Sequence, residues 1–263
     1  MAPSRPYVEI ADGETILVSS IRAVAVVAAA FVLAALLGQV GMSIVGVQSV
    51  EALQGNPLLN ASVQGLSFVG FLAASAGYLW LRQESEIVHF RTPRLSDAGW
   101  ALVGVVGILV AALVMGVVVE ALSALAEALF GTEITTGQNS IITQGQQNPR
   151  LFLYMIPVAL FLVGPGEELV FRGVVQGLFR RSFGVGPGLI VASGLFGLGH
   201  YFAISSGSAW TYILVAGALG LVLGVIYEYT ENIVVPAVTH GLWNAGLFAI
   251  QYYLATTGAQ LPA

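Results

Sequence analysis

The sequence predicts an all-α protein, a polytopic bundle of about seven transmembrane helices, with six and eight as the limits. Three observations predict this class. Of the 263 residues, 57% are hydrophobic and only 9% are charged, whereas soluble domains carry roughly a quarter charged residues. The mean hydropathy is +0.86. Several apolar stretches reach the ~20 residues that a helix needs to cross a bilayer, so membrane lipid is the first expected partner.

The apolar stretches divide the chain into consecutive segments. We expect a polar N-terminal segment (1–15), N-terminal transmembrane helices (16–130), an outer loop (131–149), a second membrane domain with a four-helix core (150–255) and a C-terminal tail (256–263). The individual spans are predicted at 16–38, 60–81, 98–119 with a continuation to 130, 150–181, 186–202, 209–227 and 233–255.

The arginines indicate an orientation in the membrane. Five of them lie in the loop after the second span or at the end of the fourth: Arg82, Arg91, Arg94, Arg180 and Arg181. The outer segments 39–59, 131–149 and 203–208 contain none. Because cytoplasmic loops carry the excess of positive charge, we expect the N-terminus and the arginine loops on the cytoplasmic face of the plasma membrane.

Composition also excludes several kinds of chemistry. The chain has no cysteine, which rules out disulfides, thiolate metal ligands and a cysteine nucleophile. Its net charge of −5 is spread along loops, so no nucleic-acid partner is expected. The glutamine- and asparagine-rich stretch 138–148 is expected to be a mobile outer loop without chemistry. The sequence predicts no particular oligomeric state.

Among the polar residues inside the predicted spans of the C-terminal half, six are informative: Glu167, Glu168, Arg172, His200, His240 and Asn244. Ionisable side chains at membrane depth are costly and by default mark function. At ~1.5 Å per helical residue, Glu167 lies about 21 Å from Arg181, and His200 lies equally far from Gly186. Asn244 lies about 20 Å beyond Glu231 by the same rise. We therefore expect three distant segments to bring polar residues to one layer.

The spacing within each segment predicts which side chains share a helix face. Glu168 and Arg172 are four residues apart and can form an ion pair, which leaves Glu167, about 100° around the helix, without the arginine. Both acids follow Pro165, where a helix N-terminus would favour negative charge. Two further pairs have the same spacing: Phe196 with His200, and His240 with Asn244.

Three motifs in this order resemble a known family. The segments EELVFR (167–172), FGLGH (196–200) and HGLWN (240–244) are similar to those of the CPBP family of intramembrane proteases. This family includes CAAX prenyl endopeptidases, lysostaphin-resistance-protein-like proteins and bacteriocin-processing or immunity proteins. The resemblance covers about residues 150–255 and implies a membrane-embedded endopeptidase whose cavity opens to the cytoplasm.

The resemblance also implies roles for the motif residues. Glu167 would be the general base, His200 would help to hold the water, and His240 and Asn244 would donate hydrogen bonds to the oxyanion. Glu168, Arg172 and Phe196 would support them. No cofactor is required in this interpretation, and an alternative places Zn²⁺ or another divalent metal on Glu167, His200 and His240. The implied substrate is a membrane-associated peptide or protein, with prenylated CAAX-type C-termini as one class.

Other interpretations of the same residues remain open. Glu168 and Arg172 also fit a structural ion pair, and His240 and Asn244 fit hydrogen bonds between helices. A non-catalytic scaffold or immunity protein would have the same fold. An ion- or proton-coupled transporter would use buried acids and histidines as a relay, but it would need polar residues leading to both faces, and the outer span ends are largely apolar.

Overall fold

The computed structural model describes residues 6–132 and 134–259 and is helical through most of them, which confirms the predicted all-α class. The long elements are α1 (Gly13–Ile44), α2 (Pro57–Arg82), α3 (Leu95–Phe130), a helical rod over Arg150–Phe183, α8 (Val185–Gly199), α9 (Ala209–Thr230) and α10 (Val234–Thr257). Six helices of the described residues are long and apolar enough to cross a membrane. This number equals the lower limit of the predicted six to eight spans. The site helix α10, which carries His240 and Asn244, is not among the six.

The rod over Arg150–Phe183 is continuous. It consists of α5 (Arg150–Val158), the π-helical turn η3 (Ala159–Val163), α6 (Gly164–Glu168), the π-helical stretch η4 (Leu169–Gln176) and α7 (Gly177–Phe183). The prediction that a helix begins at Pro165 is therefore wrong. Local π-type adjustments let a membrane helix accept a proline that lacks an N–H group, and η3 directly precedes this one. The two acids gain no stabilisation from a helix N-terminus.

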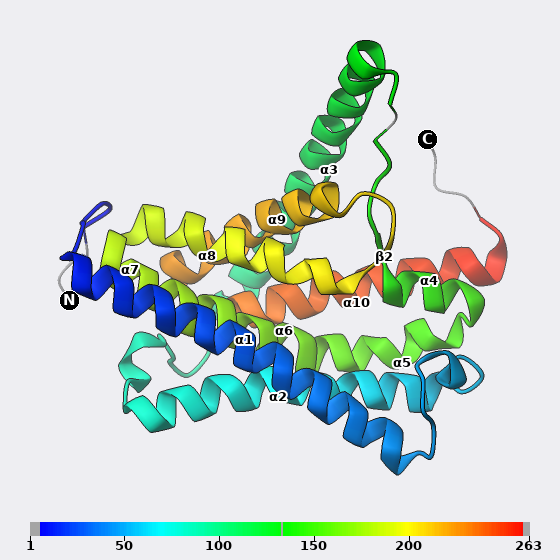
Figure 1. The fold of residues 1–263 in the computed structure, drawn as a ribbon, viewed down its shortest axis with the longest axis horizontal. Coiled ribbons are helices and arrows are strands. Elements are labelled where there is room, and N and C mark those ends of the chain that lie inside the picture. Colours follow the sequence, from blue (N-terminus) through cyan, green and yellow to red (C-terminus); the bar gives the residue numbers. More distant parts are fainter. Residues whose placement is uncertain (1–5, 133, 260–263) are drawn as a thin grey trace.

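This rod forms the centre of the bundle (Figure 1). Val170, Val174, Val175 and Leu178 are at most 1% exposed, because α1, α2 and α8 pack around this part of the rod and α10 packs along α5, η3 and α6. In contrast, α3 leaves the bundle at a steep angle, and its second half is largely exposed (Figure 1).

At one end of the rod the arginine-bearing loops meet the N-terminal segment. The backbone N–H of Glu9 donates to Phe183 O (3.1 Å), and that of Ala11 donates to Ser182 O (2.9 Å). Helix α1 begins at Gly13, after Asp12 accepts from Thr15 N as its cap (2.9 Å). The polar N-terminal segment is thus packed on the bundle from residue 6 onward, and residues 1–5 lie outside the described part.

At the other end the glutamine- and asparagine-rich stretch forms regular secondary structure, so the expectation of a loop is wrong. Its first residues form β1 (Gln138–Asn139), which pairs antiparallel with β2 (Ile204–Ser206), and α4 (Ser140–Gln147) follows. Neutral hydrogen bonds hold it, among them Asn60 Nδ2 to Gln144 Oε1 (2.9 Å). We call residues 137–147 the β1–α4 segment. The short 3₁₀ turns η1 (Glu51–Leu53), η2 (Ser85–Ile87) and η5 (His200–Ala203) complete the fold.

Candidate functional site

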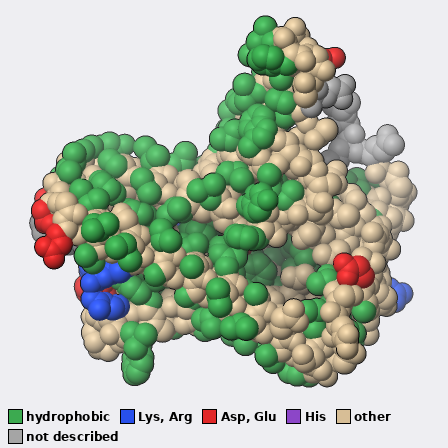
Figure 2. All heavy atoms as spheres, in the orientation of Figure 1, with side chains coloured by type: hydrophobic (Ala, Val, Ile, Leu, Met, Phe, Trp, Pro, Cys, Tyr) green, Lys and Arg blue, Asp and Glu red, His purple; other side chains and the backbone are tan. Residues whose placement is uncertain are grey.

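A cavity of about 680 Å³ lies between the central rod, α1, α2, α10, η5 and the β1–α4 segment. Figure 2 shows the molecule hollowed near the middle of one face, with hydrophobic side chains around the hollow. Glu167, His200, His240 and Asn244, the four predicted site residues, all line this cavity. The three motifs therefore meet in one place.

Glu167 faces this cavity from α6. A Cβ atom on Gly164 would lie only 2.5 Å from Ala237 O, so the absence of a side chain there lets α6 and α10 approach closely. This approach places Glu167 Oε2 3.9 Å from His240 Nε2. The distance is too long for a direct hydrogen bond. Among the described residues, none hydrogen-bonds to this buried Oε2 atom, and 13% of the Glu167 side chain is exposed where it lines the cavity.

Glu168 has the opposite situation, because it is fully buried and paired twice. Its Oε2 lies 3.2 Å from Arg172 Nε, and its Oε1 accepts from Arg172 Nη1 (3.2 Å) and from His240 Nδ1 (2.9 Å). The predicted ion pair is thus confirmed, and Glu168 also orients the imidazole. Since a carboxylate only accepts, Nδ1 of His240 carries a hydrogen and Nε2 faces Glu167.

Arg172 completes a buried charge cluster. It is 1% exposed, donates from Nη2 to Gly220 O (2.9 Å), and places its guanidinium carbon 4.2 Å from the centre of the Phe196 ring. The Phe196 ring in turn lies 4.5 Å from that of His200 and 5.8 Å from that of His240, centre to centre. Phe196 therefore packs between the arginine and both histidines, as a support.

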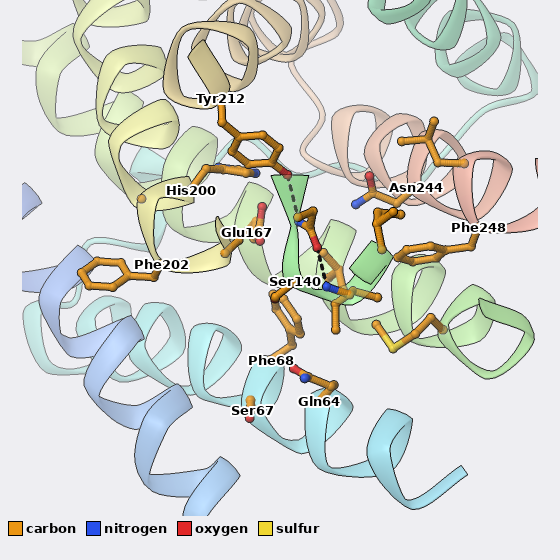
Figure 3. A pocket seen from close by; sticks show the side chains of 18 of the residues that line it. Gln64, Ser67, Phe68, Ser140, Glu167, His200, Phe202, Tyr212, Asn244 and Phe248 are labelled. Atoms are coloured by element: carbon orange, nitrogen blue, oxygen red, sulfur yellow. Dashed lines mark hydrogen bonds between the residues drawn. The ribbon is translucent and has the colours of Figure 1, made fainter. Parts of the chain in front are cut away.

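His200 reaches the cavity from the end of α8. Its Nδ1 lies 2.9 Å from Phe196 O, and because a carbonyl oxygen only accepts, Nδ1 is the donor. A neutral imidazole then has an unprotonated Nε2 that can accept from a water. Figure 3 shows His200 and Asn244 on either side of Glu167 in that view. A water bound at Glu167 would thus have an imidazole and an amide in the same cavity.

Sequence reasoning missed two residues of this cavity. Tyr212 of α9 lines it, with its ring centre 6.0 Å from that of His200. Its hydroxyl accepts from Asn139 Nδ2 of β1 (2.8 Å), and Asn139 also lines the cavity. No sequence signal singled out Tyr212, since tyrosines near the ends of spans are common interfacial residues, and Asn139 lay in the stretch interpreted as a loop.

The alternative metal set does not fit this arrangement. Within the described residues, no group of three histidine, aspartate or glutamate side chains lies close enough to hold a metal ion. The orientation of both imidazoles by hydrogen bonds to Nδ1, from His240 to Glu168 and from His200 to Phe196 O, is the kind that metal ligands also show.

The predicted opening to the cytoplasm stays a prediction, and the structure shows where the cavity lies along the rod. Val170, Val174 and Leu178 form packed core between Glu167 and the arginine end of the rod, and the cavity lies on the other side of this core, next to the β1–α4 segment. In Figure 1 these are the two ends of the long axis. If the arginine loops are cytoplasmic, the cavity lies toward the opposite face. The depth estimate located the polar layer but not the side from which it is reached.

Comparison with known proteins supports the resemblance for the C-terminal part of the chain. Residues 149–246 match the family model described as type II CAAX prenyl endopeptidase Rce1-like. The uncharacterized protein YpbD of Bacillus subtilis (strain 168) is 33% identical over 99 residues, which are 36% of this chain and 46% of that protein. The chain thus spans about half the length of the curated relative that it matches. No solved structure matches it.

Proposed function

On the premise that residues 149–246 are similar to CAAX prenyl endopeptidases, we propose that this integral membrane protein is an intramembrane endopeptidase that hydrolyses a peptide bond with a water activated by Glu167. The observation that carries the proposal is the pairing of the two neighbouring acids. Glu168 is held by Arg172 and His240, whereas the Glu167 side chain lines the cavity, is 13% exposed and has a buried Oε2 to which no described residue hydrogen-bonds.

The proposed reaction begins with proton transfer. Glu167 takes a proton from the water while the water oxygen attacks the carbonyl carbon of the peptide, and His200 Nε2 accepts the second hydrogen of the water and holds it in place. The carbonyl oxygen becomes an oxyanion. Glu167 then gives its proton to the amide nitrogen, the carbon–nitrogen bond breaks, and the products are a carboxylic acid and an amine. The carboxyl group of Glu167 returns to its starting state.

The oxyanion needs hydrogen-bond donors that are already in place. Asn244 offers the N–H groups of its amide, and His240 offers Nε2–H in its protonated form. Glu168 orients the ring for this role, because it accepts the hydrogen of Nδ1 at 2.9 Å. Glu168 and Arg172 therefore position the imidazole and do not take part in proton transfer.

We further propose a membrane-associated peptide as the substrate, with a prenylated C-terminus as the first class to test. Two features support this choice. The matched family model carries that activity in its description, and one side of the cavity is lined by the rings of Phe31, Phe68, Phe171 and Phe202, which suit an apolar chain.

The test is cleavage of a fluorogenic, farnesylated peptide by the full chain in detergent micelles or proteoliposomes. Glu167→Gln keeps the shape and removes the base, so we expect a loss of about 10²–10⁴-fold in kcat. Glu127→Gln, at an exposed position on α3, is the matched control and should cleave at the wild-type rate. Full activity of Glu167→Gln would refute the proposal.

Treatment with a chelator distinguishes the metal-free mechanism from a metal-dependent one. With a water activated by glutamate alone, treatment with EDTA followed by desalting should leave kcat unchanged. Loss of activity that returns with Zn²⁺ would instead refute the metal-free mechanism while leaving the protease assignment in place.

The transporter interpretation has less support. Between the cavity and the arginine end, the polar side chains of the rod are buried and bonded. Gln176 Nε2 donates to Glu228 Oε1 (2.8 Å), Arg180 Nη1 lies 2.9 Å from the same oxygen, and Val170, Val174 and Leu178 are at most 1% exposed. These side chains form packed structure rather than the wall of a cavity, which favours a hydrolytic site over a transport path.

A further inference from the structure

We propose that Tyr212 is a further catalytic residue, whose phenolic hydroxyl donates a hydrogen bond to the oxyanion, and that Asn139 of the β1–α4 segment holds this hydroxyl in position. The proposal rests on the proposed hydrolysis and adds a donor from α9, a helix that contributes none of the three motifs.

The geometry places the hydroxyl where the reaction would occur. Tyr212 lines the same cavity as Glu167, His200 and Asn244, and its ring centre lies 6.0 Å from that of His200. In Figure 3 the hydroxyl of Tyr212 points into the cavity, toward the space between Glu167 and Asn244. A carbonyl oxygen bound there would have the hydroxyl and the amide of Asn244 as its neighbours.

The hydrogen-bonding state of the hydroxyl leaves its own hydrogen free for a ligand. A phenol has one hydrogen to donate and can also accept. Asn139 Nδ2 donates to the oxygen at 2.8 Å, which occupies the accepting side. No described residue accepts the hydrogen of the hydroxyl, although the ring itself is only partly exposed. A donor that is fixed before the reaction costs no reorganisation when charge develops on the substrate.

Asn139 is held by its own segment. Its Oδ1 accepts from the N–H of Ile141 (2.8 Å) as the cap of α4, so both ends of the amide are engaged and its orientation is defined. Further along the segment, Thr143 Oγ1 lies 2.8 Å from Ser205 Oγ of β2. When the β1–α4 segment is folded, it therefore fixes Asn139, and Asn139 in turn fixes the direction of the Tyr212 hydroxyl. In this proposal the fold of the segment thus affects catalysis.

Tyr212→Phe removes the hydroxyl and keeps the ring, so it is the direct test in the peptide-cleavage assay. We expect kcat to fall by about 10²-fold, the effect of removing one oxyanion donor, with KM unchanged. Tyr229→Phe is the matched control, because Tyr229 lies on the same helix with 69% of its surface exposed. Thermal unfolding of each variant shows whether it is folded.

A double-mutant cycle tests the role of Asn139 as a positioning residue. If Asn139 acts through the hydroxyl, Asn139→Ala should lower kcat in the wild-type background and have no further effect in the Tyr212→Phe background. A purely structural role would lower activity equally in both. The cycle remains informative if Tyr212→Phe alone is unstable. In that background it compares Tyr212→Phe with the double variant, and both carry any defect that Tyr212→Phe causes.

The outcomes separate this inference from the proposed function. If Glu167→Gln is inactive while Tyr212→Phe retains the wild-type kcat, or raises only KM, the hydrolase stands and the additional donor is refuted. If the wild-type protein cleaves no peptide that depends on Glu167, the proposed function fails, and this inference fails with it.

Discussion

The buried cluster around Arg172 makes a quantitative prediction about stability. Glu168→Gln preserves the size of the side chain and an oxygen that can accept from His240, but it removes the negative charge. Arg172 would keep its bond to Gly220 O and its contact with the Phe196 ring. Neither contact neutralises a guanidinium that is 1% exposed, so the substitution leaves a buried charge without its counter-ion.

The size of the effect follows from this burial. Removing one partner of a buried ion pair costs about 3–5 kcal/mol, which is about a 10²–10⁴-fold change in the unfolding equilibrium constant. Replacing both partners by apolar side chains of similar volume is often neutral or stabilising. We therefore expect Glu168→Leu combined with Arg172→Met to recover most of the stability lost in Glu168→Gln, although not the activity.

The assay is reversible unfolding in mixed detergent micelles, followed by circular dichroism. Glu86→Gln is the control, because Glu86 also pairs with an arginine, at 2.8 Å from Arg181, but its side chain is 65% exposed. Exposed pairs contribute little, so no measurable change is expected. A loss below about 1 kcal/mol in Glu168→Gln, or a double variant less stable than the single one, would refute this account of the cluster.

Two further predictions concern helix packing and orientation. A Cβ atom on Gly70 would meet the backbone of α1, so Gly70→Ala should lower the free energy of unfolding by about 1–3 kcal/mol. Gly77→Ala is the control and should not lower it, because nothing lies within 4 Å of the added atom. Equal melting temperatures of the two variants would contradict the close approach of α1 and α2. Because the chain has no cysteine, Ser85→Cys and Ser206→Cys carry single thiols at the arginine end and the cavity end. In intact cells we expect an impermeant maleimide to label only Ser206→Cys, and labelling of Ser85→Cys instead would reverse the orientation.

The sequence predicted the site because its signal was local and chemical. Polar residues stand out in apolar spans, and a spacing of four residues places two side chains on one helix face whatever surrounds the helix. For this reason the pairing of Glu168 with Arg172 could be predicted, as could the distinct situation of Glu167. The convergence of three segments on one cavity followed from their equal depth, which depends only on the helical rise.

The features of the fold and site that the sequence did not predict are those that depend on tertiary contacts. The bond between Glu168 and His240 joins residues 72 positions apart, and no spacing rule reaches so far. The β1–α4 segment has the composition of a loop, and its order comes from contacts with α2, β2 and α9 that composition does not encode. The side to which the cavity opens stays a prediction, because depth from one end does not show where the core is packed.

The charges of the cluster connect its stability with the proposed reaction. In the proposed reaction, the negative charge of Glu167 moves to the oxyanion when Glu167 accepts a proton from the water, so the net charge of the site stays the same. In a medium of low dielectric constant, moving a charge costs far less than creating one. In this proposal Glu168 and Arg172 would serve catalysis as a fixed, buried ion pair while the charge of Glu167 moves.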